Sequence, residues 1–265
     1  LNVLKIMHLY NTALNDPESL KGSQTFIFGG KAAPGYYYAK TVIKLIFALS
    51  QKIEHNPKVN QKLKMVFLEN FNESQGELIY PAADISEQIS SASKETSGTS
   101  HIKFMMNGAL TLGTLDGANE EISQAVGEDN IFIFGLTTEQ ILNYTHQGWY
   151  TPWDEYYANP DIRMCVDRLN SGFFGKMGEE FKEIYDSLMI YKDEFFVLKD
   201  FRSYLEMYQK LQILYLNQED WNRISLINIA QSGVFSSDRT IKEYYSKIWK
   251  TRYRAINSLT ALSAK

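Results

Sequence analysis

The first half of the chain alternates short apolar runs with longer segments whose apolar residues recur at helical spacing. The short runs are rich in β-branched and aromatic residues, and turn residues such as Gly29 and Gly117 follow them. Strands separated by helices of this length indicate crossover connections, so the pattern predicts an α/β fold: a Rossmann-like parallel sheet with helices on both faces. The expected strands are residues 25–28, 64–68, 110–115 and 131–134.

Beyond about residue 137 the strand-like runs fade, and apolar residues recur at the spacing of helices. One long helix is expected over about residues 203–230, and a last helix is expected after Ser237. We therefore expect a Rossmann-like α/β part over residues 1–136 and a mainly helical part of the same domain over residues 137–265.

The segment over residues 77–92 is interrupted by Pro81 and places Ile85 and Ile89 at helical spacing. This spacing predicts a helix after the proline. Asp84 and Glu87 would then lie together on one helical face, and paired acidic residues on a helix usually form a solvated surface.

The chain begins without methionine, and its first residues already place Val3, Ile6 and Met7 on one helical face. Because the chain opens inside a helical pattern, we expect it to be a fragment of a longer protein.

Composition narrows the possible partners. A net charge of -4 with no long basic run argues against a nucleic-acid groove. The apolar stretches are too short to span a bilayer, which argues against a membrane protein. Cys165 is the only cysteine, so no internal disulfide is possible, which fits a cytoplasmic protein. The four histidines are scattered along the chain, so no metal site is expected.

Residues 95–103 lead from small polar residues and a glycine directly into an apolar helix expected to start near His101. A helix N-terminus offers unpaired N–H groups to an anion such as phosphate. Gly98 would let the backbone approach that anion, and Thr99 and Ser100 could add hydroxyl donors. Lys103 follows Thr99 by four residues, so both side chains lie on one helical face.

This spacing could hold a phosphate and an amine close together, as a phosphorylated aldehyde such as pyridoxal phosphate requires. The same residues also suit a plain helix cap followed by a solvated lysine. Spacing alone therefore leaves a cofactor site and a structural helix start as alternatives.

Five longer runs can be compared with known families. They are FGGKAAPGYYYAK, KMVFLEN, YPAADISEQISSASKETSGTSHIKFMMNGALTLGTLDGAN, EDNIFIFG and SGVFSSDRTIKEYYSKIW, in this order along the chain. These runs closely resemble the α-glucan phosphorylases, the family of glycogen, starch and maltodextrin phosphorylase.

The resemblance implies cleavage of terminal α-1,4-glucosidic bonds by inorganic phosphate, which gives glucose 1-phosphate. It implies pyridoxal 5′-phosphate as cofactor, with the cofactor phosphate relaying a proton. It also implies the GT-B fold, whose active site lies between two Rossmann-like domains, and a homodimeric parent protein. This chain would be part of the C-terminal domain.

By this resemblance, Lys103 is the lysine that binds the cofactor as a Schiff base, and Thr99 and Ser100 bind the cofactor phosphate. Phe71 would stack on the cofactor ring beside Asn72. The residues that would contact the glucosyl unit are Glu95, Ser97 and Gly98.

The chain departs from the family pattern near these positions. The family usually has Gly-Asn where this chain has Ser100 and His101, and a tyrosine where it has Phe71. Some members have an arginine at the position of Asn72. The arginine helps to neutralise phosphate, and Asn72 cannot.

The basic segment that binds the substrate phosphate in the family would lie before Leu1, outside this chain. We therefore expect the chain alone to be inactive. The alternative is a non-catalytic module that binds pyridoxal phosphate or serves only as a structural unit.

Overall fold

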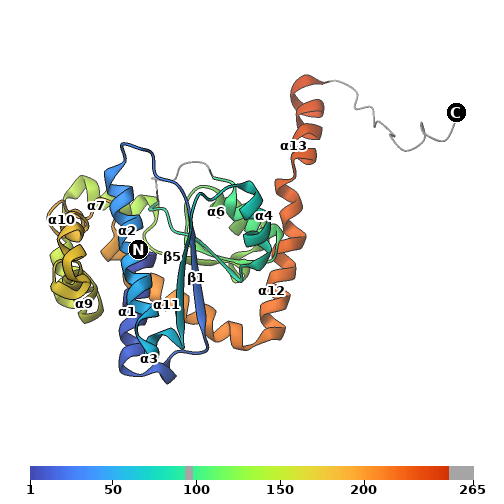
Figure 1. Ribbon diagram of the computed structural model, residues 1–265. Helices are drawn as coiled ribbons and strands as arrows, with labels where there is room; N and C mark the ends of the chain where they lie inside the picture. The colour runs from blue at the N-terminus through green and yellow to red at the C-terminus, as the bar shows by residue number, and fades with distance from the viewer. Residues whose placement is uncertain (93–97, 251–265) are drawn as a thin grey trace.

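The computed structural model describes residues 1–92 and 98–250 of an α/β protein (Figure 1). The described strands pair in parallel, with Phe26 opposite Met65 in one sheet and Leu112 opposite Phe132 in another. The α/β class with parallel strands is confirmed, but hydrogen bonding divides the strands into two sheets, β1-β2 and β3-β4-β5. The strands are β1 (Gln24–Gly29), β2 (Leu63–Leu68), β3 (Ile85–Gln88), β4 (Leu110–Thr114) and β5 (Phe132–Phe134).

Helices precede, connect and follow the strands, and the part of the chain described after β5 contains no strand. The α-helices are α1 (Asn2–Asn15), α2 (Tyr37–Glu54), α3 (Pro57–Asn60), α4 (Glu73–Ala82), α5 (Ser100–Met106), α6 (Ala118–Val126), α7 (Thr138–Gln147), α8 (Pro152–Ala158), α9 (Pro160–Leu169), α10 (Lys182–Met189), α11 (Val197–Leu216), α12 (Gln218–Gln231) and α13 (Ser237–Glu243). The 3₁₀-helical segments are η1 (Pro17–Ser19), η2 (Glu128–Asn130), η3 (Gly172–Phe181) and η4 (Ser232–Phe235), and η5 (Tyr244–Trp249) is π-helical.

Strand β3 lies where the spacing predicted a helix, so that prediction is wrong. Pro81 falls in the last turn of α4, and the backbone is already extended at Ala83 (φ -89°, ψ 133°). The Leu110 N–H then donates to the Asp84 carbonyl (2.9 Å) and opens the pairing with β4. Glu87 consequently belongs to a strand and not to a solvated helix face.

The prediction of one continuous helix over about residues 203–230 is also wrong, because two helices cover this range. Helices α11 and α12 meet at Asn217, whose backbone leaves the helical region (φ -99°, ψ 86°). The Asn217 side chain accepts a hydrogen bond from the Asp220 N–H (3.4 Å) and so caps the start of α12.

The two sheets differ in how their faces are covered. All five residues of β4 are buried, as expected for a strand covered on both faces. In the β1-β2 sheet, burial alternates along β1, and the cross-strand pair Ile27 and Val66 remains 45% and 43% exposed. The expectation of helices on both faces is therefore wrong for β1-β2 in this chain.

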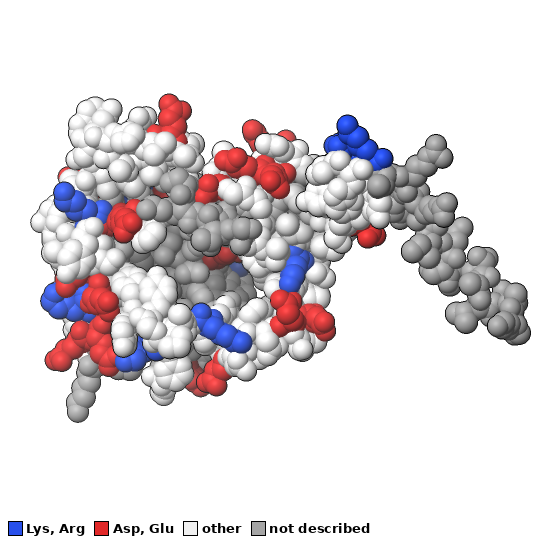
Figure 2. Space-filling view, turned by 90° about the horizontal axis from the view of Figure 1, so that it is seen from above, with Lys and Arg blue, Asp and Glu red and all other residues white. Residues whose placement is uncertain are grey.

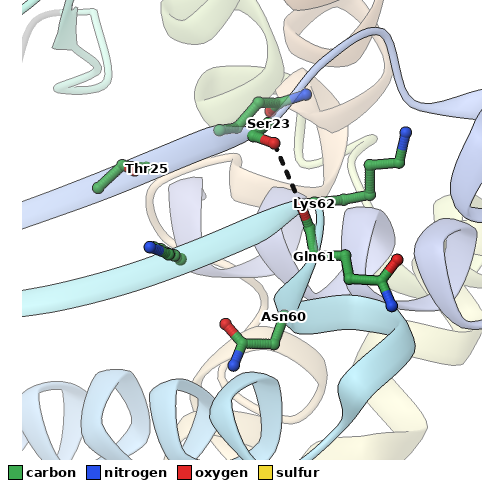
Figure 3. Close-up of a pocket in the computed structure, with 7 residues that line it drawn as sticks. Ser23, Thr25, Asn60, Gln61 and Lys62 are labelled. Carbon is green, nitrogen blue, oxygen red and sulfur yellow. Dashed lines mark hydrogen bonds between the residues drawn. The ribbon is translucent and has the colours of Figure 1, made fainter.

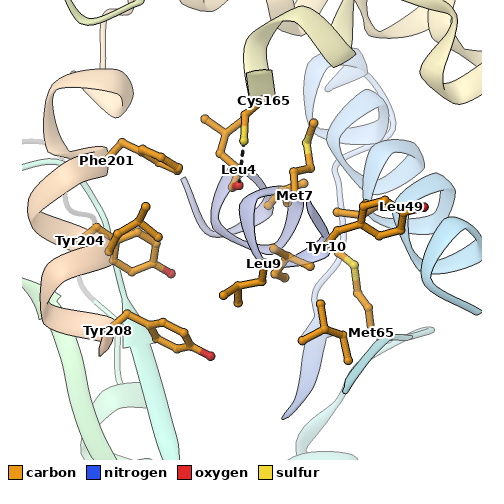
Figure 4. Close-up of a cluster of buried hydrophobic side chains, with 14 of the residues drawn as sticks. Leu4, Met7, Leu9, Tyr10, Leu49, Met65, Cys165, Phe201, Tyr204 and Tyr208 are labelled. Carbon is orange, nitrogen blue, oxygen red and sulfur yellow. Dashed lines mark hydrogen bonds between the residues drawn. The ribbon is translucent and has the colours of Figure 1, made fainter. Parts of the chain in front are cut away.

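One apolar cluster joins residues from both sides of the expected division at residue 136. Figure 4 shows Met7 of α1 between Leu49 of α2 and the α11 residues Phe201 and Tyr204. Met7, Leu49, Phe201 and Tyr204 are all fully buried. Both parts therefore contribute to the same core. Their division at residue 136 stays a prediction.

A buried lysine of α1 contacts residues of the strands. Lys5 is fully buried, and its ammonium forms an ion pair with Glu87 of β3. The Lys5 Nζ also lies 4.0 Å from the centroid of the Tyr208 ring, 5.0 Å from that of Phe26 and 5.1 Å from that of Tyr204. The Tyr204 hydroxyl donates to Glu87 Oε2 (2.7 Å), so the carboxylate has two partners. Burial lowers the pKa of Lys5, and Glu87 opposes that change.

A buried carboxylate supports the connection after β5. Asp200 of α11 is only 4% exposed and accepts a hydrogen bond from the Leu136 N–H (2.8 Å). Gly135 (φ +83°) lies against it, and a Cβ there would stand 2.9 Å from the carboxylate. Burial raises the pKa of Asp200 from its ordinary 3.8 to about 6, and nearby Asp193 adds to the increase.

We expect this aspartate to make the folded chain less stable as the pH rises from about 4 to about 6. Between these values the folded chain binds the Asp200 proton more tightly than the unfolded chain does. The resulting stability is therefore complete below about 3.8 and lost above about 6. Urea unfolding at several pH values would measure the free energy of unfolding. In the parent chain this free energy should fall by about 2–3 kcal/mol between these pH values because of Asp200, and in Asp200→Asn this fall should be absent. The exposed Asp129→Asn should leave it unchanged, and equal slopes for Asp200→Asn and the parent chain would contradict the assignment.

Candidate active site

The predicted phosphate-binding residues lie at the start of α5. Thr99 precedes this helix without making a side-chain capping bond, and its carbonyl accepts from the Lys103 N–H (3.2 Å). Gly98 and Thr99 are exposed, and Ser100 is half-buried. The first-turn N–H groups of a helix have no acceptor within that helix, so a helix start of this kind can bind an anion.

Lys103 lies one turn further along α5, and its side chain is 36% exposed. Its Nζ donates to Glu73 Oε2 on α4 (2.9 Å) and stands 5.5 Å from the centroid of the Tyr80 ring. The hydrogen bond and the charge of Glu73 raise the pKa of Lys103. Glu73 and Tyr80 were not among the predicted site residues, because the sequence does not show how α4 and α5 face each other.

An aromatic contact holds α4 against α5. The rings of Tyr80 and Phe104 meet edge to face, with centroids 4.8 Å apart. Since Phe104 directly follows Lys103, this contact places the lysine beside α4. Residues 71–72 directly precede α4, and residues 99–103 lie at the start of α5. The two groups of predicted residues are therefore found at neighbouring helices.

Phe71 and Asn72 connect β2 to α4. Phe71 is half-buried and packs on Gly29 at the end of β1, where a Cβ would stand 2.9 Å from the Phe71 ring. The Asn72 side chain caps α4 by accepting from the Gln75 N–H (3.2 Å), and it donates to the Asn70 carbonyl (3.2 Å). Asn72 therefore has a structural role that needs no cofactor.

His101, which stands where the family usually has asparagine, is buried. His101 is 1% exposed, and burial lowers its pKa, so the ring is favoured in its neutral form. It does not supply a cation for a phosphate. Two residues predicted to contact a glucosyl unit, Glu95 and Ser97, lie outside the described residues.

The donor set at α5 suits a phosphorylated aldehyde. The N-terminus of α5 could hold the phosphate. The Lys103 amine, one turn further along the same helix, could bind the aldehyde. Figure 2 shows acidic and basic side chains interspersed over the face seen from above, without a large patch of one sign. Phosphate binding at this site would use the N–H groups and hydroxyls at the start of α5.

A polar hollow of about 290 Å³ lies elsewhere, where β1 and β2 begin (Figure 3). The Ser23 hydroxyl donates to the Gln61 carbonyl across it (3.1 Å), and Asn60, Lys62 and Lys64 also line it. Ligands of open α/β sheets bind outside the carboxyl ends of the strands, which is the side of Gly29 and Phe71. The hollow is at the opposite end and is not part of the candidate site.

Residues 1–92 and 98–250 contain neither a membrane-spanning helix nor a cluster of metal ligands. In this part of the chain no helix is both long and apolar enough to cross a membrane. The same residues contain no group of three or more histidine, cysteine, aspartate or glutamate side chains placed to hold a metal ion.

The fold and the site together define an α/β protein that presents a lysine amine near the N-terminus of a helix. The sequence model of the family described as carbohydrate phosphorylase matches residues 1–251. The chain therefore belongs to the carbohydrate phosphorylase family, and the resemblance noted from its motifs is confirmed.

Relatives of this chain are glycogen phosphorylases. That of Bacillus subtilis (strain 168) is 51% identical over 249 residues, which cover 94% of this chain and 31% of the relative. The protein of Synechocystis sp. is 46% identical over 250 residues, and the human liver form is 45% identical over 250 residues. Each match covers 94% of this chain and 29% of the relative. The chain thus spans less than a third of the length of these relatives.

Proposed function

We propose that the chain is the C-terminal part of a phosphorylase that cleaves terminal α-1,4-glucosidic bonds with inorganic phosphate. The product is glucose 1-phosphate, and the substrate is glycogen, starch or maltodextrin. Family membership and the glycogen phosphorylase relatives support this proposal. The observation that carries it is the placement of Lys103 one turn beyond the N-terminus of α5.

Pyridoxal 5′-phosphate is the cofactor that this site would take. Lys103 would bind it covalently, the first turn of α5 with Thr99 and Ser100 would hold its phosphate, and Phe71 would lie beside its ring. When bound, the cofactor supplies a phosphate that relays a proton to and from the substrate phosphate. Gly98, with Glu95 and Ser97, is proposed to contact the glucosyl unit.

The protein's own residues orient and protect this arrangement. The contact between Tyr80 and Phe104 fixes α5 against α4 and so limits the directions that the Lys103 amine can take. Phe71, held on Gly29, provides an apolar surface next to the start of α4.

The remaining parts of the active site would belong to the rest of a two-domain GT-B protein. We propose that residues 1–136 form the Rossmann-like part of its C-terminal domain and residues 137–265 the helical part. The matched relatives are about three times as long as this chain, which supports a need for further polypeptide. A homodimeric parent protein and a cytoplasmic location stay predictions.

Cofactor attachment tests the proposal. We expect borohydride reduction in the presence of pyridoxal phosphate to label Lys103, because its amine lies beside the proposed phosphate site. Peptide mass spectrometry would locate the label. Lys103→Ala should lose it, whereas Lys64→Ala, which removes an exposed lysine from β2, should retain it.

Two outcomes would contradict the proposal. Label spread over exposed lysines, or unchanged in Lys103→Ala, would leave only a structural role for this segment. Glucose 1-phosphate formation from maltodextrin and phosphate by the chain alone would show that no further polypeptide is needed.

A further inference from the structure

Glu73 is the only described carboxylate in an ion pair with Lys103. It belongs to the first turn of α4, where an acidic residue already interacts well with the helix dipole. Its side chain is 84% exposed, so solvent could satisfy the carboxylate without the lysine. The pairing nevertheless directs the lysine toward α4.

Attachment of an aldehyde requires the opposite charge state of the lysine. The ammonium must first release a proton to water, because only the neutral amine has a lone pair to attack the aldehyde carbon. A C–N bond then forms, and the carbonyl oxygen leaves as water when the C=N bond is completed. No oxidant or reductant is involved.

We propose that Glu73 is a counter-ion that holds Lys103 in its charged form and slows its covalent attachment to the cofactor. This inference rests on the proposed function, because it concerns the same lysine. The described titratable groups that act on Lys103 are Glu73 and Tyr80, both on α4. Of these two, Glu73 is the one whose carboxylate forms an ion pair with Lys103.

The size of the effect follows from exposure. Because an ion pair open to solvent is weak, its removal should change an equilibrium constant by a factor of only about 1.4–5. Removing the carboxylate should therefore increase the neutral fraction of Lys103 by up to about fivefold at a pH below its pKa. The rate of attachment should rise by the same factor.

The test compares the full chain with Glu73→Gln and with Glu77→Gln. Glu77 is the matched control, since it is also an exposed glutamate on α4, one turn beyond Glu73. Trace acetylation by acetic anhydride at several pH values, mapped by mass spectrometry, reports the reactivity of Lys103 without any cofactor. We expect Glu73→Gln to react about 1.4–5 times faster at Lys103, with its pH midpoint lowered, and Glu77→Gln to match the parent chain.

A second measurement follows the rate at which pyridoxal phosphate becomes reducible onto Lys103. It should rise in Glu73→Gln by the same factor as acetylation. If acetylation of Lys103 is the same in Glu73→Gln and the parent chain, the counter-ion role is overturned, whatever the cofactor does. If none of the three proteins is labelled at Lys103, the proposed cofactor site itself fails, and the role in attachment fails with it.

Discussion

Replacing Glu87 with alanine is expected to destabilise the folded chain by about 3–5 kcal/mol, because it leaves the Lys5 ammonium buried without its partner. Lys5 is fully buried, and the rings around it provide only weak compensation for a lost carboxylate. The Tyr204 hydroxyl would lose its acceptor in the same variant. Urea unfolding followed by circular dichroism would measure the change in free energy.

Two variants separate this explanation from a general effect of truncating glutamate. Glu77→Ala removes an exposed carboxylate from α4 and should stay within about 0.5 kcal/mol of the parent chain. Lys5→Met combined with Glu87→Gln removes both charges and keeps an acceptor for Tyr204, so it should recover most of the lost stability. A double variant as unstable as Glu87→Ala would show that side-chain shape, and not the unpaired charge, causes the loss.

Gly113→Ala is expected to destabilise the chain by about 2–5 kcal/mol. A Cβ at this position of β4 would stand 2.6 Å from the Gln88 carbonyl oxygen of β3 and 2.6 Å from Asn119 Nδ2. Gln88 is backbone-paired with Gly113, so the strand must move or the Asn119 side chain must leave. Asn119 is buried and donates to the carbonyls of Thr114 (2.9 Å) and Gln88 (3.2 Å), and losing these bonds adds to the cost.

Thermal unfolding would measure this loss, with Gly30→Ala as the control. Gly30 follows β1, and a Cβ there meets no atom within 4 Å. The control should change the midpoint little. A Gly113→Ala chain with the parent midpoint would mean that β3 and β4 can separate without loss of stability.

The sequence predicted four of the five described strands because each is a continuous apolar run bounded by turn residues. Strand β3 reads Ile-Ser-Glu-Gln and has no such run. Its conformation depends on pairing with β4 and on the contact of Glu87 with Lys5, which lies 82 residues away in the chain. Neither partner can be identified from local spacing.

The same limit applies to the candidate site. Lys103 and Thr99 could be placed on one helical face because they belong to one short segment. Glu73 precedes Lys103 by 30 residues, and its approach depends on the packing of Tyr80 against Phe104. The burial of His101 likewise depends on what surrounds α5, so spacing could not show that this histidine is buried.

The shared core has a consequence for any attempt to divide the chain. Met7 and Leu49 from its first half are buried in the same cluster as Phe201 and Tyr204 from its second half. Segments that bury each other's side chains gain and lose their order cooperatively. Residue 136 therefore marks a change in the kind of secondary structure, and we expect the unit of folding to extend across it from α1 to α11.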